Sequence, residues 1–132
     1  MLAFDDLTSA TKAAAGADVI CFCAARAYPN WTKSFYALQE AAIAAARKTG
    51  AVLVAAENLY GYGVAGTLHE GLPLTATTCK GAVRARMSKR PFAAHDGDKI
   101  RAVFGRAWHM PAPKTMTGHE VARRALCCVW SA

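Results

Sequence analysis

Residues 51–63 read Ala-Val-Leu-Val-Ala-Ala-Glu-Asn-Leu-Tyr-Gly-Tyr-Gly. The apolar run from Val52 to Ala56 predicts a buried strand. The run ends in Glu57 and Asn58, and two tyrosines interleaved with glycines follow. Because ligands of open parallel sheets bind just beyond the carboxyl ends of the strands, this stretch predicts the edge of a site. A tight turn that carries two surface tyrosines is the alternative interpretation.

Four segments around this stretch are predicted to be helices, and in the second of them the apolar residues recur at helical spacing. Thr8 or Ser9 is expected to cap the first helix, and Gly16 to end it. Gly50 is the expected C-cap of the second helix. The third helix is expected to end before Pro91, because proline removes a backbone donor and clashes with the preceding turn. The predicted helices span residues 7–16, 31–48, 79–90 and 120–130.

Strands are predicted between these helices, and regular alternation of this kind is typical of a parallel sheet. The predicted fold class is α/β, a partial Rossmann-like doubly wound parallel sheet of three to four strands with helices on both faces. Residues 1–132 are expected to form one partial domain, with a divergent tail over 109–132. The predicted strands are 18–23, 51–56 and 99–104, with a remnant of a fourth at 1–4 and a loop over 105–118.

Composition narrows the class of protein. A hydrophobic fraction of 54% argues against a disordered chain, and no apolar run approaches the roughly 20 residues that a membrane span needs. The start of the chain lacks the pattern of a secretory signal. The five cysteines form no Cys-x-x-Cys pair, which favours a reduced, cytoplasmic protein. The four histidines show no metal-ligand spacing, so no metal site is expected.

The net charge of +7 is compatible with an acidic partner, such as nucleic acid or a phosphorylated small molecule. Five basic residues gather within 80–90, but Phe92 is the only aromatic residue close to them. Because single-stranded nucleic acid is bound by stacking on aromatic rings, this cluster favours a solvated helix face over a nucleic-acid surface.

Residues 61–66 fit the spacing G-x-G-x-x-G of a dinucleotide-binding turn. That motif works only when its third glycine opens a helix. Gly71 and Pro73 would break such a helix early. We therefore interpret the segment as a flexible loop at the site.

Several short motifs, in this order and spacing, resemble one known family. They are Asp6-Leu7-Thr8, Gly16-Ala17-Asp18-Val19-Ile20, Cys23-Ala24-Ala25, Asn58-Leu59-Tyr60-Gly61-Tyr62-Gly63, Thr77-Thr78-Cys79-Lys80-Gly81, Ala93-Ala94-His95 and Gly105-Arg106-Ala107. The chain resembles the NAD-dependent epimerase/dehydratase family of extended short-chain dehydrogenases over about residues 5–108. No single motif is decisive.

The resemblance implies that the chain binds NAD or NADP. It places Asp6 and Leu7 against the adenine, although Asp6 suits a helix N-cap equally well. It places Cys23, Ala24 and Ala25 where the backbone passes the ribose and pyrophosphate, since only small side chains leave room there.

The chain departs from the family at the catalytic positions. The family's Ser or Thr would stand at Ala56, and its Tyr-x-x-x-Lys would fall at Thr78 and Ala82. The glycine-rich turn before the matched region and the carboxy-terminal substrate domain are also not found. The chain is therefore expected to be a fragment or a truncated descendant of such an enzyme.

Other residues are candidates for the missing chemistry. Asn58, Tyr60 and Lys80 are the predicted catalytic residues, with Tyr60 as donor and Glu57 or Lys80 as base. Assignment of Lys80 to a solvated helix face is the alternative.

Three hypotheses follow. The first is an NAD(P)-binding oxidoreductase or epimerase-type domain that acts on a small molecule and is inactive unless it is completed by further chain. The second is a non-catalytic binding or protein-interaction module that kept the sheet and lost the chemistry. The third, a basic nucleic-acid-binding domain, is least favoured. An exposed edge of the third strand also predicts a homo-oligomer.

Overall fold

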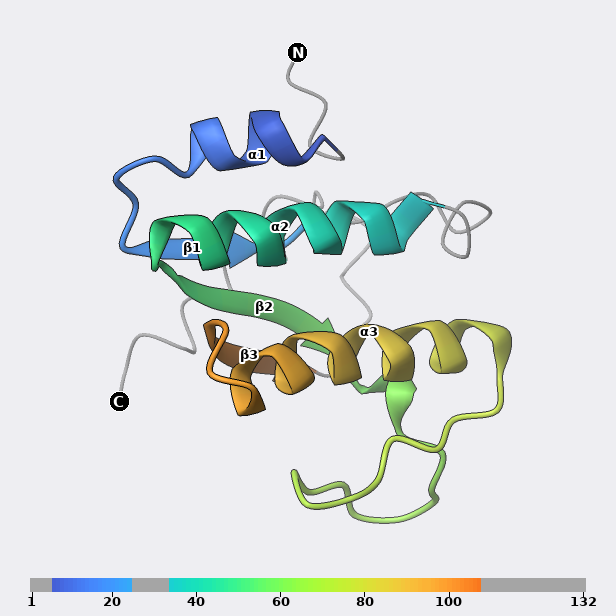
Figure 1. Cartoon of the computed structure of the whole chain (residues 1–132). Coiled ribbons are helices and arrows are strands. Elements are labelled where there is room, and N and C mark those ends of the chain that lie inside the picture. Colours follow the sequence, from blue (N-terminus) through green and yellow to red (C-terminus); the bar gives the residue numbers. More distant parts are fainter. Residues whose placement is uncertain (1–5, 25–33, 108–132) are drawn as a thin grey trace, which may run out of the picture.

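The computed structural model describes residues 6–24 and 34–107. Within them, three parallel strands form one sheet in the order β1-β2-β3. This confirms the predicted class, a partial Rossmann-like α/β fold in which helices flank a parallel sheet. The elements are α1 (Leu7–Ala13), β1 (Val19–Phe22), α2 (Tyr36–Thr49), β2 (Val52–Asn58), the 3-10 helix η3 (Leu59–Gly61), α3 (Cys79–Asp96) and β3 (Arg101–Ala107) (Figure 1).

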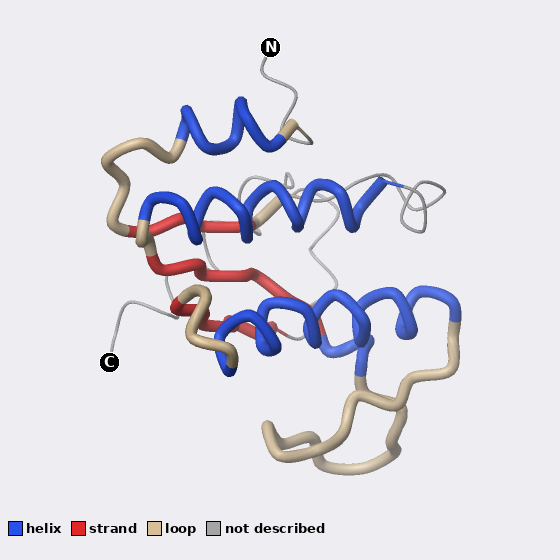
Figure 2. The backbone as a smooth tube through the Cα atoms, in the orientation of Figure 1, coloured by secondary structure: helices blue, strands red, loops and turns tan. Residues whose placement is uncertain are grey.

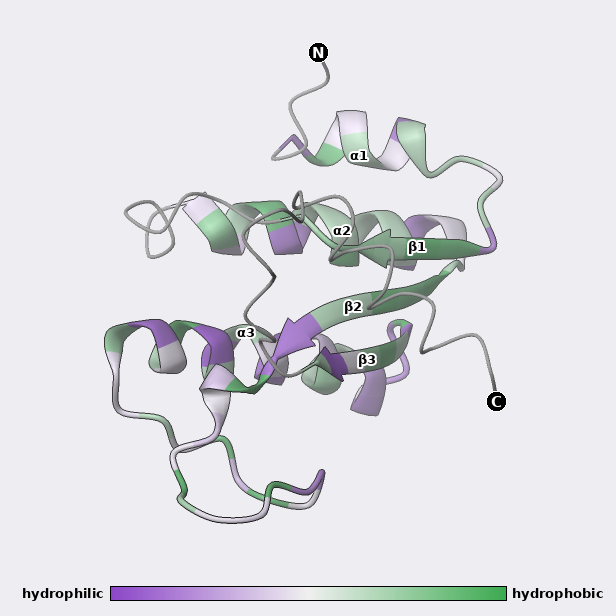
Figure 3. Ribbon diagram, turned by 180° about the vertical axis from the view of Figure 1, so that it is seen from behind, coloured by the Kyte–Doolittle hydropathy of each residue, from purple (hydrophilic) through white to green (hydrophobic). Residues whose placement is uncertain are grey.

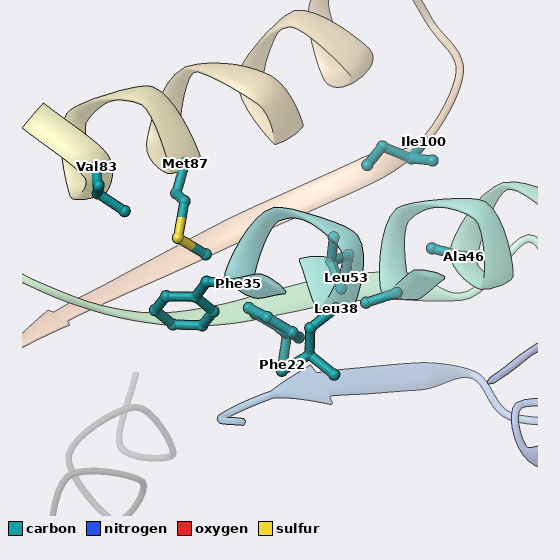
Figure 4. Packing of buried hydrophobic residues seen from close by; sticks show 9 residues of the cluster. Phe22, Phe35, Leu38, Ala46, Leu53, Val83, Met87 and Ile100 are labelled. Atoms are coloured by element: carbon teal, nitrogen blue, oxygen red, sulfur yellow. The ribbon is translucent and has the colours of Figure 1, made fainter. Parts of the chain in front are cut away.

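The core lies between the sheet and two helices. α2 and α3 lie side by side over the strands, whereas α1 lies beyond β1, next to α2 (Figures 1 and 2). Alternate residues of β2 point into this layer, and Leu53 and Ala55 are at most 1% exposed. Figure 4 shows side chains of β1, β2, α2 and α3 meeting in one cluster with residues that flank α2 and β3. The cluster comprises Phe22, Phe35, Leu38, Ala42, Ala46, Leu53, Val83, Met87 and Ile100.

The helix ends differ from the prediction at α1. Asp6, rather than Thr8 or Ser9, is the N-cap, and its carboxylate accepts hydrogen bonds from Thr8 N at 3.3 Å and Ser9 N at 2.9 Å. The helix ends at Ala13, and Gly16 then turns the chain with a φ of 76°. Gly50 is confirmed as the C-cap of α2, in the left-handed conformation that glycine adopts without strain.

The prediction that the third helix ends before Pro91 is wrong, because α3 continues to Asp96. A proline at position 91 leaves the carbonyl of Met87 without its helical donor. Gln39 of α2, fully buried, donates from Nε2 to Met87 O at 3.0 Å and replaces that donor. The helix therefore tolerates Pro91 because a side chain from the neighbouring helix completes its hydrogen bonding.

The second and third strands extend beyond their predicted ends. Glu57 and Asn58 belong to β2 instead of the loop after it, and residues 105–107 belong to β3 instead of the predicted loop. The added residues of β2 pair with the added residues of β3. In the parallel register, Glu57 lies opposite Arg106 and Asn58 lies opposite Ala107.

Parts of the prediction fall outside the described residues. These are the strand remnant at 1–4, the start of the second helix at 31–33, and the helix at 120–130 with the tail that contains it. Within the part of the chain that the structure describes, no helix has the length and apolarity to cross a membrane.

Candidate functional site

The carboxyl ends of the three strands lie at one edge of the sheet, because the strands are parallel. Figure 3 shows hydrophilic residues at the arrowheads of β2 and β3, in contrast to the apolar bodies of the strands. This edge is where open α/β sheets bind their ligands. The predicted site residues are distributed along it in two groups, one beyond β2 and one beyond β1.

Glu57 is the most deeply buried charged group at this edge. Its side chain has no exposed area, and its Oε2 accepts a hydrogen bond from Nη1 of Arg84 on α3 at 3.3 Å. Burial raises the pKa of Glu57, against the opposing charges of Arg84 and Arg106. A role for Glu57 as a catalytic base stays a prediction; in this structure its carboxylate is buried against Arg84.

Asn58 organises the chain beyond β2. Its side-chain Oδ1 accepts a hydrogen bond from Tyr60 N at 3.1 Å, which makes it the N-cap of η3. This contact gives Asn58 a local structural role and turns the chain so that Tyr60 follows directly after the sheet.

Tyr60 and Lys80 are brought together although they are 20 positions apart. Both line one shallow surface depression, together with Thr78 and Cys79. The depression is held in place by tight packing, since a Cβ at Gly81 would lie 2.5 Å from Tyr60 O. Asn58 does not line this depression, so only two of the three predicted catalytic residues share a surface.

Thr78 and Ala82 stand where the family's Tyr-x-x-x-Lys would fall. Thr78 is the N-cap of α3, and its hydroxyl accepts a hydrogen bond from Gly81 N at 3.1 Å. Ala56 and Ala82 are exposed and carry no group able to transfer a proton. The segment 61–66 leads from η3 into a loop, and no described helix opens at Gly66, which agrees with our rejection of the dinucleotide motif.

The second group lies beyond β1. α1 runs antiparallel to β1, so Asp6 at its start lies toward the same end of the molecule as Cys23 and Ala24 (Figure 1). The hydrogen bonds from Ser9 hold the pKa of Asp6 below its usual value, because they favour the charged form. Leu7 is 54% exposed. Asp6 is thus an N-cap, as one of its two interpretations predicted, and its role toward adenine stays a prediction.

Cys23 and Ala24 are exposed, whereas Ala25 lies outside the described residues. Partial desolvation of its sulfur and the neighbouring Cys21 both raise the pKa of the Cys23 thiol. An apolar groove of about 320 Å³ runs between α1, β1 and α2. Its walls are mainly alanine and β1 side chains, including Ala10, Ala13, Ala17 and Ala24. These small side chains fit the requirement for a closely approaching ligand.

Sequence reasoning missed the arginines that organise the site. Arg84 was part of a basic cluster assigned to a solvated face, yet it is buried against Glu57 and its guanidinium lies 4.7 Å from the centre of the Phe35 ring. Arg106 donates to the hydroxyl of Tyr62 at 3.1 Å. The one available signal was a glutamate at the end of an apolar strand, which requires a cationic partner if it is buried. No group of residues in the described ranges could hold a metal ion.

No protein-family model and no curated protein matches this chain. Two solved structures resemble it in fold. The UDP-Glc/GlcNAc 4-epimerase of Campylobacter jejuni matches at 16% identity with a TM-score of 0.62, over 78% of this chain and 36% of the epimerase. A double mutant of the dTDP-glucose 4,6-dehydratase DesIV of Streptomyces venezuelae, solved with NAD bound, matches at 16% identity with a TM-score of 0.68, over 96% of this chain and 43% of the dehydratase.

The chain thus spans less than half the length of either enzyme. At this identity the match establishes that the chain shares its fold with a part of each enzyme.

Proposed function

We propose that this chain is part of an NAD(P)-binding domain of an epimerase/dehydratase-type oxidoreductase. The observation that carries the proposal is the pair of small, exposed residues Cys23 and Ala24 at the carboxyl end of β1, in a fold similar to that of a dehydratase solved with NAD. Asp6, Leu7, Cys23, Ala24 and Ala25 are the proposed contacts of the nucleotide. The exposure of Leu7, Cys23 and Ala24 leaves them available for this role.

The proposed reaction site is the depression that Tyr60 and Lys80 share. Tyr60 would donate the proton to a small-molecule substrate, and Lys80 would supply the positive charge beside it. Asn58 would act through the backbone of Tyr60, which it holds. A bound dinucleotide would supply the hydride chemistry, since none of the described side chains carries a redox group of that kind.

Completion by further protein is part of this proposal. The three strands match less than half of each similar enzyme, and β1 has a neighbour strand on one side only within the described residues. A sheet of the Rossmann type continues at such an edge, where its glycine-rich turn also lies. We propose that a longer chain, a partner or a second copy supplies those strands in a cytoplasmic setting.

The alternative function is a non-catalytic binding or interaction module. The observation that favours it is the replacement of the family's hydroxyl and Tyr-x-x-x-Lys by Ala56, Thr78 and Ala82. Such a module would bind the nucleotide or a protein partner without turnover.

The test is a thermal unfolding measurement of the purified chain with and without millimolar NADH or NADPH. A ligand that binds only the folded state raises its stability by about 2.7 kcal/mol at a concentration of 100 Kd. We expect one of the two cofactors to raise the midpoint. The cofactor with the larger shift identifies the preference between NAD and NADP.

A pair of variants localises this effect. Ala24→Phe places a large side chain in the groove and is expected to abolish the shift. Ala93→Phe, at an exposed position on α3, is the matched control and should retain it. A midpoint that no cofactor changes, or an equal shift in both variants, would contradict the proposed nucleotide site. A shift accompanied by turnover would exclude the non-catalytic module.

A further inference from the structure

A third concavity lies beside the carboxyl end of β3, apart from the groove at β1 and the depression at Tyr60. Its volume is about 550 Å³. Residues of α3 and β3 line one part of it, and residues of the loop after η3 line another. The apolar part of the lining is Leu59, Leu68, Phe92 and Phe104. The last two stack with ring centres 4.1 Å apart, so they form a continuous aromatic surface.

The loop that covers this pocket is fixed at its base. Ala76 N donates to Gly61 O at 3.1 Å, which joins the two ends of the loop. Gly63 lies so close to Thr75 that an added Cβ would be 2.6 Å from its carbonyl carbon. Because the base is packed, the arm that carries Leu68, His69 and Glu70 to the pocket starts from a defined position.

Arg106 is the cation of this pocket. Its Nη1 donates to the Tyr62 hydroxyl at 3.1 Å, and its guanidinium carbon lies 5.5 Å from the Tyr62 ring centre and 5.7 and 5.8 Å from those of Phe92 and Phe104. In residues 6–24 and 34–107, no carboxylate forms an ion pair with Arg106. A guanidinium has five N–H donors in a planar fork that suits a carboxylate. The bond to the Tyr62 hydroxyl uses one of these donors, and the aromatic rings hold the group in place without occupying the others.

The geometry points to a binding site for a small monoanionic carboxylate with an apolar body. The carboxylate pairs with the guanidinium of Arg106, and the apolar body lies against Phe92 and Phe104. Arg–carboxylate pairs of this kind are charge-assisted and geometrically specific.

The charge of the lining favours a carboxylate over a phosphate. Glu70 lines the same pocket as Arg106, so these two permanent charges are of opposite sign and balance each other. A dianionic phosphate would be repelled by Glu70 and would find one arginine to offset its two charges. A monoanion keeps the attraction of Arg106 with a smaller penalty.

This proposal does not depend on the nucleotide site, because none of the groove residues at β1 lines the pocket at β3. It is tested without NADH or NADPH. The probe is 4-phenylbutyrate, added to the ¹⁵N-labelled chain in an NMR titration. Its neutral amide and phenyl phosphate are the comparison ligands.

We expect 4-phenylbutyrate to shift the amide signals of residues 62–70 and 104–107, and to bind about tenfold more tightly than the amide. Arg106→Gln should weaken the acid about tenfold and leave the amide unchanged. Lys89→Gln is the control with the same loss of charge at an exposed position of α3, and it should bind as the parent chain does.

A second variant keeps the test decisive if Arg106→Gln fails to fold. Glu70→Gln changes an exposed side chain, and it should improve the binding of phenyl phosphate several-fold relative to that of the acid. Equal binding of acid and amide, tighter binding of phenyl phosphate by the parent chain, or no shifts in these residues would each overturn the proposal. The last result would leave the pocket as a packing surface for protein.

Discussion

Two regions of the molecule use a carboxylate in opposite ways. The first comprises β2 and α3, and the second comprises α1 and β1. In the first, Glu57 is buried and paired with Arg84, and burial raises its pKa. In the second, Asp6 is exposed, caps a helix and has a lowered pKa. α1 has no buried residue and β1 has only Phe22 buried, whereas β2 buries every second residue through Glu57. The buried charge pair therefore lies on one side of the molecule, and the proposed nucleotide contacts lie on the other.

The largest loss of stability is expected when the buried ion pair between Glu57 and Arg84 is broken. Glu57→Ala leaves the Arg84 guanidinium buried without its carboxylate, and loss of one partner of a buried pair costs about 3–5 kcal/mol. Urea unfolding measures this loss. The control is Glu40→Ala, which removes an ion pair with Arg90 whose side chains are 43% and 42% exposed. That change should cost less than about 1 kcal/mol, because exposed pairs contribute little. Similar losses in the two variants would show that the comparison between buried and exposed carboxylates is wrong.

A smaller effect is expected at the contact between α2 and α3. Gln39→Met removes the donor to Met87 O and should cost about 1–3 kcal/mol, since a buried carbonyl loses its partner. Pro91→Ala restores a backbone N–H at the position that normally bonds this carbonyl.

The two changes should therefore be non-additive. With Pro91→Ala present, Gln39→Met should cost about 1 kcal/mol less than it does alone. A double-mutant cycle by urea unfolding checks this coupling. Strict additivity would mean that Gln39 acts through packing rather than through the carbonyl that Pro91 leaves open.

The smallest expected effect concerns the pH dependence of stability, to which the two carboxylates contribute with opposite sign. The folded-state pKa of Glu57 lies above its ordinary value of 4.5, so its contribution to stability decreases as pH rises from 4.5 through the folded-state value. The folded-state pKa of Asp6 lies below 3.8, so its contribution is present above 3.8 and is lost as pH falls through the folded-state value.

Substitution of each carboxylate isolates its contribution to the pH dependence of stability. Glu57→Gln should remove the decrease in stability above pH 4.5, and Asp6→Asn should remove part of the loss below pH 3.8. Thermal unfolding over a series of pH values measures both. Identical pH profiles for the parent chain and Glu57→Gln would contradict the raised pKa.

The alternation of apolar runs with helical segments was enough to predict the strands, their parallel arrangement and the Gly50 cap, because these depend on local pattern. The ends of β2, α3 and β3 were not predictable in this way. Glu57 and Pro91 are each unfavourable by local rules, and each is accommodated by a residue far away in sequence, Arg84 and Gln39 respectively. The proximity of Tyr60 and Lys80 likewise follows from the packing of η3 on α3, which no sequence spacing displays.

The hydrogen bond between Gln39 and Met87 also has a kinetic consequence. α3 reaches its full hydrogen bonding only when α2 lies against it, so the carboxyl-terminal turns of α3 gain stability late, after the helices have docked. If docking precedes the rate-limiting barrier, Gln39→Met slows refolding; if it follows, the same change mainly accelerates unfolding. One buried amide thus reports the order in which the two halves of this helical layer assemble.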